Sequence, residues 1–175
     1  LTIAVQGVGH VGLYLCENLH RDGANILVSD IVQDYLDEAL NKYGATVVSP
    51  DEILSVECDV LSPCALGAVL NDDTIPNLRT TIIAGGANNQ LAEDSHGVCL
   101  MDRGVLYAPD YVINAGGIIN VSGETSGNYD LKSINAKVDN IYDKLMHIFE
   151  RADHEKRPTN VVADEMAEEI IANAK

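Results

Sequence analysis

The amino-acid sequence predicts an α/β fold of the doubly wound type, in which a mostly parallel sheet is followed by additional C-terminal helices. Short apolar runs typical of strands alternate with helical stretches from the first residues onward. Glycine stands directly after the helical stretches, at Gly23, Gly44 and Gly104, where it would end each helix. The strand runs are apolar along their length rather than alternating, as expected for a sheet that helices cover on both faces.

Strands and helices of the alternating part follow one another along the chain. The expected strands are residues 2–5, 25–29, 46–48, 59–61, 81–84 and 105–107. The expected helices are residues 10–22, 34–43 and 95–103. This alternation implies right-handed crossovers between parallel strands.

After Gly117 the pattern changes to long helices. Asp130 can cap a helix that Pro158 ends, and Thr159 then opens the last one. The apolar face expected on the first comprises Ile134, Val138, Ile141, Tyr142, Leu145, Ile148 and Phe149. The face expected on the second comprises Val162, Met166, Ala167 and Ile170.

Size and charge limit the class of protein. The 175 residues, 46% hydrophobic and 22% charged, indicate one globular domain over residues 1–175. A net charge of −16 argues against a nucleic-acid partner and against docking on anionic membrane. No apolar run approaches the ~20 residues that cross a bilayer. The chain opens in an expected strand, with neither a leader nor a starting Met, so we expect a fragment of a longer protein.

The cysteines do not suggest a metal site. Cys16, Cys58, Cys64 and Cys99 are scattered without the spacing that zinc requires, so we expect no metal. Cys16 falls among leucines of a helix and is expected to be buried. Reduced cysteines are typical of a cytoplasmic protein, which is the expected location.

A glycine-rich turn joins the first strand to the first helix. Its residues are Gly7, Val8, Gly9, His10, Val11 and Gly12, a complete G-x-G-x-x-G. The motif alone is weak, but a strand before it and a helix after it are the context that a dinucleotide site requires. The glycines allow a tight turn, a close approach of the backbone to a pyrophosphate, and packing of the helix on the strand. The sequence therefore predicts a Rossmann-type fold.

An acidic residue stands where the ribose of such a cofactor is expected. Asp30 ends the second strand, eighteen residues after Gly12, and its carboxylate can accept hydrogen bonds from ribose hydroxyls. The same charge would repel a 2′-phosphate, and Ile31, Val32 and Gln33 supply no cation. NAD is therefore favoured over NADP. The alternative is a turn that binds nothing, with Asp30 serving as a cap.

Amides and glycines follow two later strands. Residues 82–90 and 109–117 each place such residues beyond a strand end. Ligands of open parallel sheets lie at the carboxyl ends of the strands, so both segments are positioned to line the cofactor cleft. Simple turns, which asparagine and glycine also favour, are the alternative.

Several of these segments together resemble a known family. They are VQGVG at 5–9, PCALG at 63–67, ANNQ at 87–90, YAPDYVINAGG at 107–117, PT at 158–159 and ADEMA at 163–167. The chain resembles, from end to end, the NAD-binding domain of the glutamate/leucine/phenylalanine/valine dehydrogenases, and the leucine branch most of all. The resemblance implies oxidative deamination of an L-amino acid to a 2-oxo acid and ammonia, with hydride passing to NAD.

The resemblance also implies roles for individual residues. The glycine turn, Asp30 and Ile31 would hold the pyrophosphate and the adenosine ribose, and Cys64 and Ala65 would flank the adenosine side. Asn89 would lie by the nicotinamide ribose, and Ala87 and Asn88 would also bind the cofactor. Asn114 would lie where nicotinamide and substrate meet. Ile118 and Val121, three apart on one helix face, would line an apolar pocket for a branched side chain. Without the resemblance these two residues would be interpreted as ordinary core.

The expected catalytic groups are not in this chain. In the family, the lysines and the aspartate that handle the substrate belong to an N-terminal catalytic domain, and we assign no catalytic residue here. The isolated domain is therefore expected to bind NAD without turnover, and the parent enzyme is expected to be a homo-oligomer.

The sequence leaves three alternatives to a leucine or valine dehydrogenase to consider. A phenylalanine or glutamate dehydrogenase of the same family would differ mainly in its pocket and stays open. A non-catalytic NAD-sensing module would not need Asn114 and the glycines after it. A 2-hydroxy-acid dehydrogenase would need a catalytic histidine paired with a carboxylate, for which His96 is a weak candidate.

Overall fold

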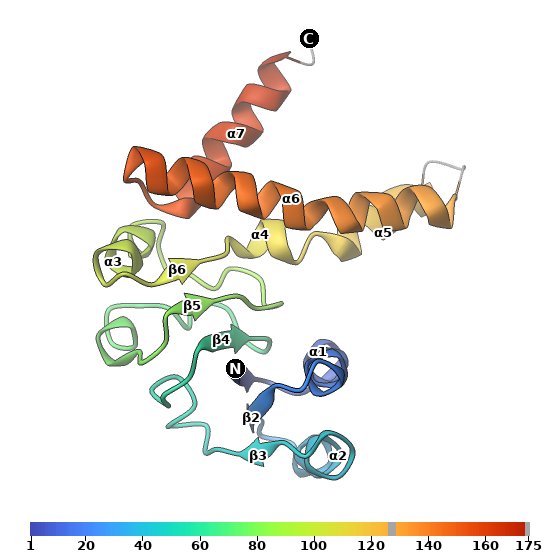
Figure 1. The fold of residues 1–175 in the computed structure, drawn as a ribbon, viewed down its shortest axis with the longest axis vertical. Helices are drawn as coiled ribbons and strands as arrows, with labels where there is room; N and C mark the ends of the chain where they lie inside the picture. Colours follow the sequence, from blue (N-terminus) through green and yellow to red (C-terminus); the bar gives the residue numbers. More distant parts are fainter. Residues whose placement is uncertain (126–128, 174–175) are drawn as a thin grey trace.

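The computed structural model describes residues 1–125 and 129–173 and contains a six-stranded parallel sheet (Figure 1). The strands are β1 (Thr2–Gln6), β2 (Asn25–Ser29), β3 (Thr46–Val47), β4 (Val60–Pro63), β5 (Ile82–Ile83) and β6 (Leu106–Tyr107). Their order across the sheet is β3-β2-β1-β4-β5-β6, and every pairing is parallel. The predicted doubly wound α/β fold is confirmed. Strand order reverses between β1 and β4, which is where such sheets bind ligands.

Two hydrophobic cores cover the two faces of the sheet. Ile3 and Val5 of β1 belong to one core, with α1 (His10–Arg21) and α2 (Gln33–Tyr43), whereas Ala4 belongs to the other. Successive strand residues point to opposite faces, so a strand between two cores must be apolar throughout. The second core contains residues of η1 (Ile75–Asn77) and α3 (His96–Asp102). Cys16 is completely buried, as predicted.

The predicted helix ends are confirmed. Gly23, Gly44 and Gly104 have φ angles of 77°, 65° and 71°, in the left-handed region that glycine adopts without strain. β2 has its predicted range, and the other strands differ from the predicted ranges by one or two residues at an end. The largest differences are β4, which extends to Pro63, and β5, which contains only Ile82 and Ile83.

In the described part of the chain, four helices follow the sheet: α4 (Asp110–Ile113), α5 (Gly116–Thr125), α6 (Leu131–Glu155) and α7 (Thr159–Asn173). Asp130 caps α6 as predicted, because its carboxylate accepts hydrogen bonds from the N–H groups of Lys132 and Ser133, both at 3.2 Å. Pro158 does not end this helix, which corrects the prediction. The helix ends at Glu155, and Lys156 adopts a left-handed conformation with φ 55°.

The long helices are buried less than predicted. Of the apolar face expected on α6, Ile134 and Ile148 are buried, whereas Tyr142 is 69% exposed. Figure 1 shows that α5 lies beside α6 and that α6 extends past the sheet. Helix α7 projects away from the sheet. None of the described helices is both long and apolar enough to cross a membrane.

Candidate dinucleotide-binding site

The three motif glycines have different surroundings in the turn between β1 and α1. Gly7 has a φ of 91°, and its N–H donates to the carbonyl oxygen of Ser29 at 2.7 Å. A Cβ atom at Gly12 would collide with the carbonyl oxygen of Gly7, whereas one at Gly9 would meet nothing within 4 Å. Gly7 and Gly12 thus serve the protein's own packing. Gly9 leaves its backbone open to a ligand.

Helix α1 begins at this open backbone. Its N-cap is Gly9, no side chain caps it, and its first turn holds no acidic residue. Helix N-termini carry unsatisfied N–H groups and a partial positive charge, which attract anions such as phosphate. His10 and Val11, at the start of the helix, are exposed, so this end of α1 is accessible to a ligand.

Asp30 joins the glycine turn to the end of β2. Its carboxylate accepts hydrogen bonds from the N–H groups of Val8 at 2.7 Å and Val32 at 2.9 Å. A carboxylate has about four acceptor positions, so these bonds leave capacity for ligand hydroxyls. Ile31 beside it is 92% exposed. The carboxylate is therefore held at the glycine turn by backbone hydrogen bonds.

Two further loops meet the turn at the carboxyl ends of β4 and β5. The Cys64 N–H donates to the Gln6 carbonyl oxygen at 2.7 Å, and the Ala87 N–H donates to that of Pro63 at 2.9 Å. Ala65 lies so close to Gly7 that a Cβ atom on Gly7 would collide with it. The predicted residues 7–12, 64–65 and 87–89 therefore come together at one edge of the sheet.

Cys64 is a packing residue in this arrangement. Burial raises the pKa of its thiol above the usual value, even though contacts with Gly86 and Ser62 act in the opposite direction. The thiol is therefore protonated at neutral pH and is not poised as a nucleophile.

Asn114 and Asn88 connect the loops after β6 and β5. The side-chain amide nitrogen of Asn114 donates to the side-chain oxygen of Asn88 at 2.6 Å. Asn89 next to it has a φ of 51°, a left-handed conformation that asparagine tolerates better than most residues. The amides of both predicted segments thus meet at the carboxyl edge of the sheet.

Ile118 and Val121 lie on α5, just beyond Asn114. They are 73% and 54% exposed, and no residue of α5 is buried. The interpretation of these two residues as ordinary core is therefore wrong. They lie on a different element from the glycine turn, and both side chains are open to solvent.

Sequence reasoning missed the residues that shape these loops. Gln90 is completely buried, and its Nε2 donates to the carbonyl oxygens of Gly85 at 2.8 Å and Ala87 at 3.0 Å. Only the amide-rich composition of the segment could have indicated it.

Part of the later segment has a different role from the one expected. The Tyr107 hydroxyl donates to Asp110 at 3.0 Å, and that of Tyr111 donates to Asp164 at 2.6 Å and to the Asn160 carbonyl oxygen at 3.0 Å. Burial, followed by these carboxylates, raises the pKa of both tyrosines. These bonds tie α4 to β6 and α7.

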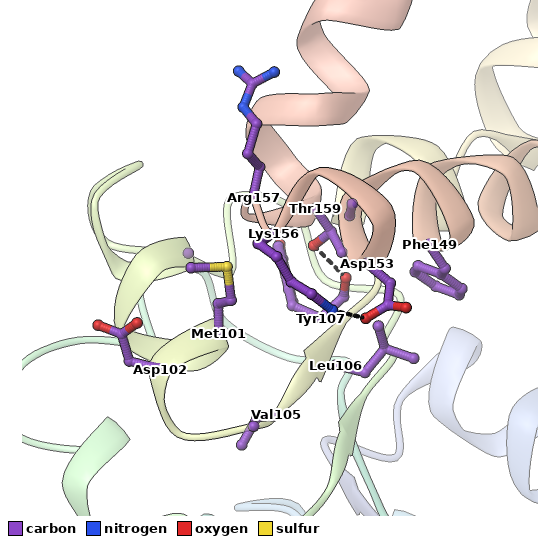
Figure 2. A pocket seen from close by; sticks show the side chains of 13 residues that line it. Met101, Asp102, Val105, Leu106, Tyr107, Phe149, Asp153, Lys156, Arg157 and Thr159 are labelled. Carbon is purple, nitrogen blue, oxygen red and sulfur yellow. Dashed lines mark hydrogen bonds and ion pairs between the residues drawn. The ribbon is translucent and has the colours of Figure 1, made fainter.

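A cavity of about 380 Å³ lies elsewhere, between α3, β6 and the α6–α7 connection (Figure 2). Its cations are already paired, Lys156 with Asp153 at 2.9 Å and Arg157 with Glu155 and Glu165. The Thr159 hydroxyl donates to the Tyr107 carbonyl oxygen at 2.6 Å. None of the predicted site residues lines this cavity, so it is separate from the candidate site.

Known proteins are similar to this chain in sequence and in fold. The profile of the glutamate/leucine/phenylalanine/valine dehydrogenase family matches residues 28–174. A leucine dehydrogenase from Thermoactinomyces intermedius is 51% identical over 97% of this chain and 46% of its own length. A valine dehydrogenase from Streptomyces coelicolor is 42% identical over 99% of this chain and 48% of its own length.

A solved structure agrees with these relatives. The crystal structure of L-tryptophan dehydrogenase from Nostoc punctiforme superimposes with a TM-score of 0.95 and 48% identity, over 99% of this chain and 52% of that one. The chain spans about half the length of the relatives it matches. It belongs to the glutamate/leucine/phenylalanine/valine dehydrogenase family.

Proposed function

We propose that residues 1–175 are the NAD-binding domain of an amino acid dehydrogenase. The parent enzyme converts a branched-chain L-amino acid, water and NAD⁺ reversibly to the 2-oxo acid, ammonium, NADH and a proton. The observation that carries the proposal is the glycine turn with its open Gly9 backbone, bonded to Asp30 through Val8. A phosphate group and a ribose need these two elements side by side.

The residues of this chain bind and orient the cofactor. The N-terminus of α1 holds the pyrophosphate, Asp30 accepts bonds from the adenosine ribose hydroxyls, and Cys64 and Ala65 border the adenosine. Asn89 lies by the second ribose, and Asn114 by the nicotinamide and the substrate. The bound cofactor supplies the hydride acceptor. The groups that move protons belong to the remaining half of the protein.

Leucine or valine is the proposed substrate. Exposed Ile118 and Val121 offer an aliphatic surface next to Asn114, against which a charged side chain such as that of glutamate would be desolvated without a partner. Tryptophan is the second candidate, because the 48% identical Nostoc punctiforme protein is a tryptophan dehydrogenase. Rates of the full-length parent enzyme with leucine, valine, phenylalanine, glutamate and tryptophan decide among them.

The choice of NAD over NADP rests on Asp30. In calorimetric titrations of this chain we expect NAD and ADP-ribose to bind and NADP to bind at least tenfold more weakly, because the carboxylate repels a 2′-phosphate. Asp30→Asn should weaken NAD binding about tenfold or more, since a charge-assisted hydrogen bond contributes roughly 1.5–3 kcal/mol. The same substitution should also bring the dissociation constants for NAD and NADP closer together.

Asp34→Asn on α2 is the matched control, because it removes the same charge close by. It should leave the ratio of the two dissociation constants unchanged. Equal affinities of the unaltered chain for NAD and NADP would contradict the preference. Absence of any binding would contradict the cofactor site itself.

The parent enzyme is further proposed to be a cytoplasmic homo-oligomer. All four cysteines are free, which suits a reducing compartment. The oligomeric state rests on the family resemblance, and light scattering of the full-length protein tests it.

A further inference from the structure

We propose that Asn88 is a positioning residue, which holds the Asn114 side chain so that its oxygen Oδ1 is presented to an N–H donor, the carboxamide of the nicotinamide ring. The inference rests on the proposed NAD site and assigns to Asn88 a role through another residue. It starts from the 2.6 Å hydrogen bond between the two amides.

The direction of this bond fixes the polarity of Asn114. A side-chain amide has one donor end and one acceptor end on a planar group. Because Nδ2 of Asn114 donates to Asn88, the acceptor atom Oδ1 of Asn114 can accept a hydrogen bond from another group. Within the described part of the chain, Oδ1 of Asn114 has no hydrogen-bond partner. The ligand group that meets it must therefore donate a hydrogen.

The place of the pair in the sheet points to the far end of a dinucleotide. Asp30 follows β2, the glycine turn follows β1, and Asn88 and Asn114 follow β5 and β6. In the order β2-β1-β4-β5, three strand steps separate Asp30 from the loop of Asn88, which is about 14 Å. A dinucleotide with its adenosine at Asp30 and its pyrophosphate at α1 extends along this edge and brings its nicotinamide to the pair.

The loop around Asn88 is built to hold its position. Gln90, completely buried, donates to the carbonyl oxygens of Gly85 and Ala87 on the near side of Asn88. The Asn89 carbonyl oxygen accepts from the Ala68 N–H at 2.6 Å on the other side. Asn88 thus stands on an anchored backbone, and fixing its side chain in turn fixes the amide of Asn114.

The test compares three ligands by calorimetric titration: NAD, its 3-acetylpyridine analogue and ADP-ribose. The analogue keeps the ring carbonyl but replaces the amide NH₂ by a methyl group. The unaltered chain should bind NAD about fivefold more tightly than the analogue, the value of one neutral hydrogen bond. Asn88→Leu frees the Asn114 amide to rotate, so this ratio should fall to about one, whereas any lost contact with the second ribose would weaken NAD and the analogue equally.

Asn88→Asp separates this proposal from its reverse. Aspartate still accepts from Asn114, so the fivefold ratio should persist, even if the added charge weakens both ligands equally. If Asn88 were instead the donor, Nδ2 of Asn114 would face the ring carbonyl, which both ligands carry, and the unaltered chain would show no ratio. Asn18→Leu on α1 is the control for removing an exposed asparagine amide, since Asn18 bonds only within its own helix.

Each outcome has one meaning. Loss of the ratio in Asn88→Leu and its retention in Asn88→Asp support the proposal. An unchanged ratio in Asn88→Leu, a lost ratio in Asn88→Asp, or no ratio in the unaltered chain overturns it while ADP-ribose binding leaves the proposed cofactor site standing. Failure of ADP-ribose to bind the unaltered chain overturns both.

Discussion

At the scale of single residues, the glycines of the turn between β1 and α1 separate folding from binding. All three fit one motif in the sequence, yet a side chain at Gly12 would strike the Gly7 carbonyl group, while one at Gly9 would enter open space. A side chain that meets no protein atoms has little steric effect on folding, but it occupies the space that a pyrophosphate would use.

Substitution of these glycines should therefore have opposite effects. Gly12→Ala should lower the free energy of unfolding by about 1–3 kcal/mol or more, because the new methyl group overpacks the turn. Gly9→Ala should cost less than about 1 kcal/mol, through the poorer N-cap, but should remove most ADP-ribose binding. Urea unfolding and calorimetry measure the two effects. Strong ADP-ribose binding by Gly9→Ala would refute the role given to this backbone.

At the scale of secondary-structure elements, ion pairs hold α7 against α6. Arg151 bonds Glu155 at 2.8 Å and Glu169 at 3.0 Å, and Arg157 bonds Glu155 and Glu165. Hydrogen bonds from these arginines lower the pKa of Glu155 and of Glu165. A network of paired charges thus joins two helices that also share an apolar cluster. Its buried residues are Ile148, Ala152, Val162 and Ala163, and Phe149 and Met166 pack against them.

The network should make stability depend on pH under acid conditions. A carboxyl group with a lowered folded-state pKa stabilises the fold above its ordinary pKa near 4.5 and loses this effect as pH falls through the lower folded-state value. Glu165→Gln should therefore lower Tm by about 2 °C at pH 6 and by less near pH 3. Circular dichroism at both pH values measures this.

Glu168→Gln on the same helix is the control, because it removes an equal charge outside the network. A Tm difference between Glu165→Gln and the unaltered chain that is the same at pH 6 and pH 3 would rule out the ion-pair explanation.

At the scale of the whole molecule, the helices that follow the sheet leave large apolar side chains exposed. Ile118, Val121 and Tyr142 are large, apolar and exposed on α5 and α6. The matched relatives are about twice as long as this chain. The apolar surface on α5 is where we propose that the remaining half of the enzyme and the substrate side chain pack.

The isolated chain should bind NAD but form no NADH from L-leucine, since the proton-transfer groups are proposed to lie in the other half. Absorbance at the NADH band measures this, with the full-length parent enzyme as the positive control. NADH formation by the isolated chain at a rate near that of the parent would contradict the division of roles.

The sequence by itself determined the features that depend on neighbours along the chain. Apolar runs predicted the strands, Gly23, Gly44 and Gly104 predicted helix ends, and the spacing from Gly12 to Asp30 predicted that an acidic residue lies at the glycine turn. Each of these rests on backbone conformation or on one strand-turn-helix unit, so the residues that decide it are close in sequence. The end of α6 was misplaced because Lys156 adopts its left-handed conformation before Pro158 acts.

Only the tertiary structure decided which distant residues meet. Asn88 bonds Asn114 across 26 residues, and Tyr111 bonds Asp164 across 53. Both contacts depend on the strand order and on how α7 returns to β6, which no local pattern encodes. The exposure of Ile118 was also decided at this level, because the same apolar spacing occurs on buried and on exposed helix faces. Burial depends on what else packs against a helix, and that is a property of the folded molecule.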